Sequence, residues 1–418
     1  MPPHPWPRAS PIGNPRRPTR VRNGKGGSST ADLRPHDWGS TLLTHCAEMP
    51  SFKPTQLWPA KPHTLAKIEI VRRYLYLWFV IFGANPKHKR LVYIDGFAGP
   101  GKYTNSDQSS PTAALIAARA AVQRQPGLAS KECSFFFVEK IPEFANGLRA
   151  ILSETTWPPQ LNWSVEEGTF EEKMTQILDD LRRDTQYLPP TFAFIDPFGA
   201  TGLPFKIVAD ILGNRSCEVL LNLDSDGIGR LVAAQGFQKN QTNLDSIFGD
   251  CSWRTELDPT LPMARLSADV LRLYKRRLRT IPKVDYVFPF AMNSKEGQLN
   301  YHLVFASQVP LGLEKMKETM KAVDQSGSYS FSDDSVGQER FRFDVPGPFA
   351  LKMQAALGGA WRPCARFRDY ALNETPFVNP KSMLAHLKKL GKVRVNWVGS
   401  ASARGFPEAK IRSIWVEP

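Results

Sequence analysis

The chain has 418 residues, of which 42% are hydrophobic and 22% charged, so it is long enough for two or three domains and has the composition of a globular protein. The longest apolar stretch, residues 74–84, is too short to cross a bilayer, which excludes a membrane-spanning protein. The net charge of +14 is concentrated at the two ends, because residues 1–31 carry six basic residues and no acidic one, and residues 345–418 carry twelve basic and four acidic ones. These ends are therefore the expected sites of any phosphate contact, unless the basic surface serves only solubility.

The first 59 residues are predicted to be a disordered basic extension outside the fold, since the segment begins with a run rich in proline, arginine, glycine and serine. The five cysteines are scattered, with no C-x-x-C pair and no histidine at ligand spacing. This pattern predicts no metal site and reduced thiols, and it places the protein in the cytoplasm.

From about residue 60 onward, short apolar strands alternate with helices. Residues 68, 71, 75, 78 and 82 recur at helical spacing and predict an amphipathic helix that ends near Gly83. The predicted elements that follow are strand 91–95, helix 112–124, strand 134–139, helix 142–153, strand 162–166, helix 170–183, strand 191–196, helix 204–212 and strand 217–223. This alternation predicts a parallel sheet that is covered by helices on both faces.

The order of elements changes after a basic helix at about 266–280. Strands 285–291 and 301–307 are separated by a short polar turn, which predicts a hairpin at the end of the sheet. Five parallel strands followed by such a hairpin are the arrangement of the Rossmann-like, S-adenosylmethionine-dependent methyltransferase fold. A dinucleotide-binding domain would instead continue with parallel strands. We therefore predict an α/β methyltransferase-like domain over residues 60–324.

Residues 325–346 are polar and rich in glycine and serine, which predicts a linker. Helices near 348–357 and 380–390, with a further segment around 365–372 between them and strands at 393–397 and 411–415 after them, predict a small winged-helix domain over residues 347–418. A winged helix binds either nucleic acid or protein. Basic side chains on the last helix and the wing favour nucleic acid, and the candidate contacts are His386, Lys388, Lys389, Lys392, Arg394 and Arg404.

The glycine loop after the first strand has two interpretations. The segment 96–102 matches G-x-x-x-x-G-K, and the strand that ends at Asp196 resembles the second motif of an ATPase. However, Tyr103 stands where a phosphate-binding loop needs serine or threonine, and Pro100 removes a backbone donor. For a sulfonium ligand the same loop is favourable, because Asp95 can organise the cationic methionine moiety and the glycines allow the backbone to approach.

Other candidate residues lie at the carboxyl ends of the following strands. Glu139 ends the second strand, where a carboxylate can accept hydrogen bonds from ribose hydroxyls. The sequence 168–170 is a weaker candidate for the edge of an adenine pocket. Asp196 ends the fourth strand and can accept a hydrogen bond from an exocyclic amine, while Phe198 can stack on an extruded base. Asn222 is expected to wall the same pocket.

Together, these segments resemble the three-Cys-motif partner family of bacterial, methyltransferase-like proteins. The resemblance covers residues 62–324 and, through the winged helix, the C-terminal part; its motifs are LAKIEIVRRYLYLWF, IDGFAGPGKY, FFFVEK, TFAFIDPFGATGLP, CEVLLNL and YHLVFAS. It implies a partner protein that carries three cysteines and is similar to radical S-adenosylmethionine proteins.

The resemblance also implies roles for individual residues. The loop motif is similar to the donor-binding motif of nucleic-acid adenine methyltransferases, which implies that Asp95, Gly96, Phe97, Gly99 and Gly101 bind S-adenosylmethionine, with Glu139 as the ribose acid. The segment IDPFG resembles the D-P-P-[YF] motif of those enzymes at Asp196, Pro197 and Phe198, but it lacks the second proline and shifts the aromatic residue by one position.

Three functions follow from these patterns. The first is a methyltransferase that acts on an exocyclic amine of nucleic acid. The second is a non-catalytic adaptor that binds nucleic acid or the partner protein and keeps a vestigial donor pocket. The third is an ATPase with a phosphate-binding loop.

Overall fold

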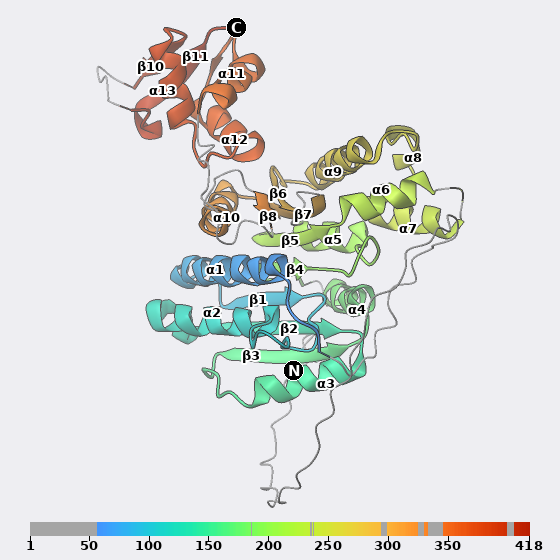
Figure 1. Cartoon of the computed structure of the whole chain (residues 1–418). Coiled ribbons are helices and arrows are strands. Elements are labelled where there is room, and N and C mark those ends of the chain that lie inside the picture. The colour runs from blue at the N-terminus through green and yellow to red at the C-terminus, as the bar shows by residue number, and fades with distance from the viewer. Residues whose placement is uncertain are drawn as a thin grey trace, which may run out of the picture.

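The computed structural model describes residues 57–184, 186–234, 236, 238–293, 299–324, 330–332, 346–398 and 405–418. Most of the predicted N-terminal extension, residues 1–56, lies outside the described residues. The folded part has a large α/β domain and a smaller C-terminal domain at one edge of its sheet (Figure 1).

An eight-stranded sheet forms the centre of the large domain, with the strand order β3-β2-β1-β4-β5-β7-β6-β8. Strands β1 to β5 run parallel, β7 runs antiparallel to both β5 and β6, and β8 runs parallel to β6. The strands are β1 (Arg90–Asp95), β2 (Glu132–Glu139), β3 (Leu161–Glu167), β4 (Thr191–Ile195), β5 (Cys217–Leu223), β6 (Tyr286–Asn293), β7 (Leu299–Ser307) and β8 (Ser330–Ser332). This order and the terminal hairpin confirm the predicted Rossmann-like methyltransferase fold.

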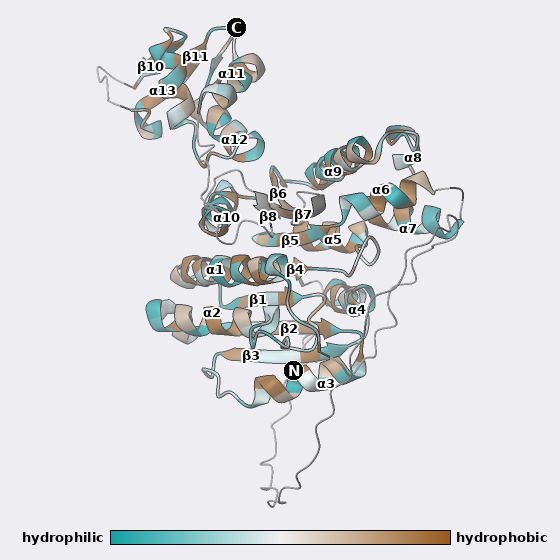
Figure 2. Ribbon diagram, viewed as in Figure 1, coloured by the Kyte–Doolittle hydropathy of each residue, from teal (hydrophilic) through white to brown (hydrophobic). Residues whose placement is uncertain are grey.

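Helices cover both faces of the sheet and form two separate cores, because successive side chains of a strand point to opposite faces. In β1, Tyr93 packs in the core under α1, while Ile94 packs in the core under α4. The first face carries α1 (Pro62–Ala84), α2 (Ser110–Arg124), α3 (Pro142–Ser153) and α10 (Pro310–Val323), and the second carries α4 (Phe170–Arg183), α5 (Phe205–Leu212), α6 (Ser225–Ala233), α7 (Gln238–Phe248) and α9 (Met263–Thr280). Figure 2 shows hydrophobic residues along the central strands and hydrophilic ones on the outer helices.

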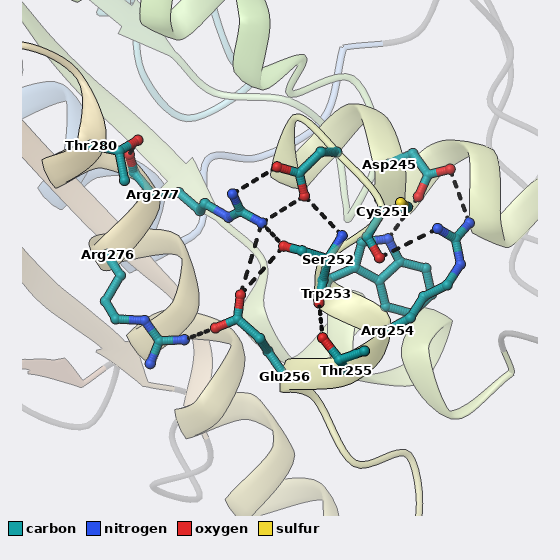
Figure 3. A network of polar contacts seen from close by, with 11 residues as sticks. Asp245, Cys251, Ser252, Trp253, Arg254, Thr255, Glu256, Arg276, Arg277 and Thr280 are labelled. Atoms are coloured by element: carbon teal, nitrogen blue, oxygen red, sulfur yellow. Dashed lines mark hydrogen bonds and ion pairs between the residues drawn. The ribbon is translucent and has the colours of Figure 1, made fainter.

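The sequence predicted only α9 in the segment that joins β5 to β6. The structure adds α6, α7 and the short helix α8 (Trp253–Glu256), which polar contacts tie to α9 (Figure 3). Arg277 of α9 reaches the carboxylate of Asp250 with donor–acceptor distances of 2.6 and 2.8 Å. The indole of Trp253 donates to Asp245 at 2.8 Å. These contacts join the helices of the insertion to one another, while its buried side chains pack in the core on the second face of the sheet.

The C-terminal domain has three helices and a three-stranded antiparallel sheet of order β10-β11-β9 around its own core. Its elements are α11 (Pro346–Leu357), β9 (Trp361–Arg362), α12 (Cys364–Glu374), α13 (Lys381–Lys389), β10 (Val393–Trp397) and β11 (Ile411–Val416). The predicted linker is not wholly a linker, because its residues 330–332 form β8 and pair with β6. The rest of it up to residue 345 lies outside the described residues.

Helix α12 docks the C-terminal domain onto β6 and α10. The hydroxyl of Tyr286 donates to Asp369 at 2.9 Å, and the side chain of Asn373 accepts from the backbone of β6 at 3.0 Å. The ammonium of the fully buried Lys317 donates to the carbonyls of Ala371 and Phe377 at 3.1 and 3.2 Å, and also to that of Thr375. These three hydrogen bonds, from one buried lysine to carbonyls at and just after the C-terminal end of α12, join the two domains.

No helix among the described residues combines the length and the apolar character needed to cross a membrane.

Candidate functional site

A cavity of about 390 Å³ lies at the carboxyl edge of the parallel strands. The chain changes direction between β1 and β4, which are neighbours in the sheet although β2 and β3 lie on one side and β5 on the other. Open α/β sheets bind ligands in the crevice at such a switch point. The loops after β1, β2, β3 and β4 line the cavity through Gly96, Phe97, Gly99, Val138, Glu139, Lys140, Ile141, Phe144, Gly168, Thr169, Phe170, Glu171, Phe198, Thr201 and Gly202, together with Trp58.

The three predicted loop glycines have different surroundings. Gly99 lines the cavity, adopts a φ of +68°, and has nothing within 4 Å of the position where a Cβ would be. A Cβ on Gly96 would instead meet the Phe170 ring at 2.6 Å, and one on Gly101 would meet Leu148 at 2.9 Å. Gly96 and Gly101 therefore permit close packing around the loop, whereas Gly99 leaves the backbone open toward the cavity.

Glu139 lies at the floor of the cavity, at the end of β2, as its position in the sequence suggested. One of its carboxylate oxygens accepts from the backbone nitrogen of Gly99 at 2.8 Å, and the other accepts from that of Ile141 at 2.8 Å. The side chain thus joins the glycine loop to the start of α3. Each oxygen keeps a further lone pair for a ligand hydroxyl.

Asp95 does not line the cavity, which corrects the expectation that it contacts a ligand directly. The residue is completely buried beneath the loop. One carboxylate oxygen accepts from the backbone nitrogen of Phe97 at 3.3 Å, and the other accepts from the Tyr93 hydroxyl at 3.4 Å. Burial is the main reason that the pKa of this carboxyl rises to about 7. Asp95 therefore shapes the loop from below.

Asp196 follows β4 and is bonded through both carboxylate oxygens. The ammonium of Lys67 lies 2.6 Å from Oδ2, and the amide nitrogen of Asn222 donates to Oδ1 at 2.7 Å. Lys67 also lies 4.9 Å from the centre of the Tyr301 ring. The sequence predicts Asp196 and Asn222 at the cavity, but neither residue lines it, and the sequence does not predict Lys67. The available signal was its place one turn before Val71 on the buried stripe of α1.

Phe198 is the exposed aromatic residue at the rim of the cavity, and 74% of its surface is accessible. The preceding Pro197 is buried, so the chain turns outward between them. A large aromatic ring in this position has one face free for a planar partner.

Residues 57–59 belong to the folded domain, which corrects their assignment to the N-terminal extension. The indole of Trp58 lies against three rings from different segments, with centroid distances of 5.7 Å to Phe144, 6.1 Å to Tyr103 and 6.4 Å to Phe198. Trp58 also lines the cavity. A single aromatic residue next to a proline-rich run gave no periodic signal in the sequence.

The basic residues predicted on the C-terminal domain are distributed over α13 and β10, away from the cavity. Lys388, Lys389 and Arg394 are exposed, whereas the imidazole of His386 packs near Gly347 at the start of α11. Lys392 donates to Gln354 at 3.3 Å. Arg404, the remaining candidate, lies outside the described residues.

Comparisons with known proteins give matches only at the level of structure. No protein-family model matches the chain, and no curated protein is significantly similar to it. Trm1 from Pyrococcus horikoshii, solved with S-adenosyl-L-methionine, is 9% identical with a TM-score of 0.31, over 64% of this chain and 62% of that protein. The SAH-bound methyltransferase PaMTH1 from Podospora anserina is 11% identical with a TM-score of 0.26, over 56% of this chain and 76% of that protein. At these values the fold assignment rests on the strand order described above.

Proposed function

We propose that the protein is an S-adenosylmethionine-dependent methyltransferase that acts on an exocyclic amine of nucleic acid. The observation that carries the proposal is the cavity at the β1–β4 switch point, in which the open backbone of Gly99 and the carboxylate of Glu139 lie together. A nucleoside ligand needs both features, because its ribose hydroxyls are donors and its remaining parts lie close to the loop backbone.

The residues present fit this cofactor. Gly168, Thr169 and Phe170 line the part of the cavity next to β3, where an adenine ring would lie, and Glu139 lies between them and the glycine loop. When bound, the donor supplies an electrophilic methyl group on a sulfonium centre. The protein holds the donor, orients the acceptor nitrogen and keeps the two in line.

An ATPase is disfavoured by the course of the loop. A phosphate-binding loop leads directly into the N-terminus of a helix, whose backbone donors hold the phosphates. Here Lys102 is exposed and the chain first forms a turn bridged between Tyr103 and Ser106, so that α2 begins only at Ser110. The loop thus lacks the helix end that nucleotide phosphates require.

The nucleic-acid target is supported by two surfaces. Phe198 offers an exposed ring at the mouth of the cavity, and Asp196, two residues before it in the chain, carries a carboxylate that can orient an amine. The C-terminal domain has the order helix, strand, helix, helix, strand, strand, which is that of a winged helix, and its basic residues on α13 and β10 are candidates for phosphate contacts. The resemblance of the sequence motifs to those of the three-Cys-motif partner family is the reason that we include a three-cysteine partner protein in the proposal.

A non-catalytic adaptor is the second candidate, and the contacts of Asp196 favour it. Both oxygens of this carboxylate already have partners in Lys67 and Asn222, and the motif lacks its second proline. A protein of this kind binds the donor or nucleic acid but transfers no methyl group.

One set of measurements separates the candidates. The purified protein is titrated with S-adenosylmethionine and with Mg-ATP in a thermal-shift assay, since a ligand that binds the folded state raises its stability. Transfer of a tritiated methyl group to total nucleic acid is then measured with and without the three-cysteine protein. Donor binding with transfer supports the methyltransferase, donor binding without transfer under either condition supports the adaptor, and stabilisation by Mg-ATP alone refutes both.

A further inference from the structure

The segment just before α1, residues 57–61, forms a strap over the cavity. Its Trp58 is half-buried, lines the cavity and contacts Phe144 on one side and Phe198 on the other. The remaining walls come from the strand ends and from the loops and helix starts that follow them, so the strap adds a wall from a part of the chain that precedes the sheet.

The strap is held in place by the turn that follows the glycine loop. The side chain of Asn105 accepts from the backbone nitrogen of Ala60 at 2.7 Å and donates to its carbonyl at 3.0 Å. The backbone nitrogen of Thr104 donates to the carbonyl of Trp58 at 3.1 Å. Asn105 thus pairs with one strap residue as a neighbouring strand would, and this fixes where the indole lies.

We propose that Trp58 is a donor-binding residue, and that Asn105 is the positioning residue that holds it over the bound ligand. The inference rests on the proposed function, because its ligand is the adenosyl-sulfonium donor. An indole face suits both parts of that ligand, since it stacks on a purine and attracts a cation. The strap, which lies outside the sheet, would therefore cover the bound ligand.

A purely structural tryptophan and a ligand-binding one differ in what their replacement changes. A structural residue affects the unfolding temperature and leaves the affinity of the folded protein unaltered. A ligand-binding residue changes the affinity, and its fluorescence reports the ligand. Replacing Asn105 separates the structural role from the ligand-binding role further. The replacement removes no aromatic ring and breaks only the hydrogen bonds that hold the strap.

The experiment measures the affinity of the full-length protein for S-adenosylmethionine and for S-adenosylhomocysteine, by calorimetry and by tryptophan emission. The variants are Trp58→Phe, Trp58→Ala and Asn105→Ala. The control is Trp361→Ala, which removes a 52% exposed tryptophan from β9 of the C-terminal domain. We expect Trp58→Ala and Asn105→Ala to weaken binding of both ligands at least about fivefold, corresponding to about 1 kcal/mol. Trp58→Phe should stay within about threefold of wild type, and the control should bind normally.

The emission change on ligand addition should be lost in Trp58→Phe, which keeps an aromatic ring and the fold. Unchanged affinity of Trp58→Ala and Asn105→Ala, in a wild-type background that binds the donor, would overturn the inference and leave the proposed function intact. A wild-type protein that binds neither ligand would overturn both. If Trp58→Ala does not fold, the donor affinity of Asn105→Ala and the emission change of Trp58→Phe test the inference in its place.

Discussion

The ammonium of Lys67 lies 2.6 Å from the carboxylate of Asp196, and the two residues are 129 positions apart in the chain. The side chain of Lys67 is 10% exposed and that of Asp196 21%, so the pair lies at the edge of the core, where water screens it only partly. Lys67 fixes the direction in which the carboxylate of Asp196 points. An ion pair in this place links the first helix of the domain to the proposed acceptor site.

Replacing either member of this pair should depress methyl transfer without loss of the donor. Asp196→Ala removes the carboxylate that orients the target amine, and we expect transfer to fall about 100-fold while donor affinity stays near the wild-type value. Lys67→Met leaves the carboxylate in place but without its cation, so transfer should fall as well. Single-turnover transfer and donor calorimetry on each variant check this.

Arg73→Met serves as the control, because it removes a half-exposed charge from the same helix. Activity that survives Asp196→Ala would place the chemistry elsewhere in the molecule.

Phe198 should act on the nucleic acid and not on the donor. Phe198→Ala removes a stacking surface worth about 1–3 kcal/mol, so binding of single-stranded oligonucleotides should weaken while donor affinity is kept. Phe198→Tyr preserves the ring and should be tolerated. Fluorescence titration with labelled oligonucleotides measures both variants, and equal affinity of the alanine variant and wild type would remove the stacking role.

A side chain at Gly99 should block the donor. Gly99→Val puts a β-branched residue at a φ of +68° and extends it into the cavity, so donor binding should be lost while helix content remains. Gly391→Val is the matched control, because Gly391 has a φ of +75° and equally open surroundings in the C-terminal domain. Calorimetry and circular dichroism on both variants distinguish a blocked cavity from general backbone strain. Normal donor affinity of Gly99→Val would exclude the loop from the site.

The exposed cations of the C-terminal domain should set the salt dependence of nucleic-acid binding. We expect the triple variant with glutamine at Lys388, Lys389 and Arg394 to bind more weakly and with a flatter slope, since each lost phosphate contact removes about 0.9 from the slope for duplex DNA. Lys206→Gln, a highly exposed lysine of α5, is the control. Titrations at several salt concentrations test this, and an unchanged slope would assign the domain to protein contacts.

The buried acid Glu218 should make stability depend on pH. Its carboxylate accepts from the hydroxyls of Tyr74 at 2.5 Å and Ser307 at 2.9 Å, and burial raises its pKa to about 7. The folded state therefore holds a proton that the unfolded chain releases near pH 4.5. The stabilisation from this raised pKa is complete below pH 4.5. It is lost as the pH rises to about 7, which lowers the free energy of unfolding by about 3 kcal/mol.

Glu218→Gln has no proton to release, so its unfolding free energy should fall less than that of wild type between pH 4.5 and 7. Denaturant unfolding of both proteins over this range measures the difference. Parallel curves would show that Glu218 is not the group responsible.

The amino-acid sequence by itself determined the sheet and the loop. Short apolar runs that alternate with helical periodicity fix parallel strands, and the hairpin after α9 fixes the methyltransferase-type order, because both follow from local spacing and turn chemistry. The place of Gly99 and Glu139 also followed, since the carboxyl ends of parallel strands meet at one edge of a sheet. The signals for these features are local, because hydrophobic periodicity and turn residues are set by neighbours along the chain.

The tertiary structure alone decided which side chains meet. It brought Trp58 over the cavity, paired Lys67 with Asp196, and turned Asp95 beneath the loop instead of into the site. It also paired β8 with β6, although β8 belongs to a segment with the composition of a linker. Such contacts join residues far apart in sequence, and they depend on how whole helices and strands pack. No local pattern carries that information, because an isolated tryptophan or lysine has the same propensities wherever the fold later puts it.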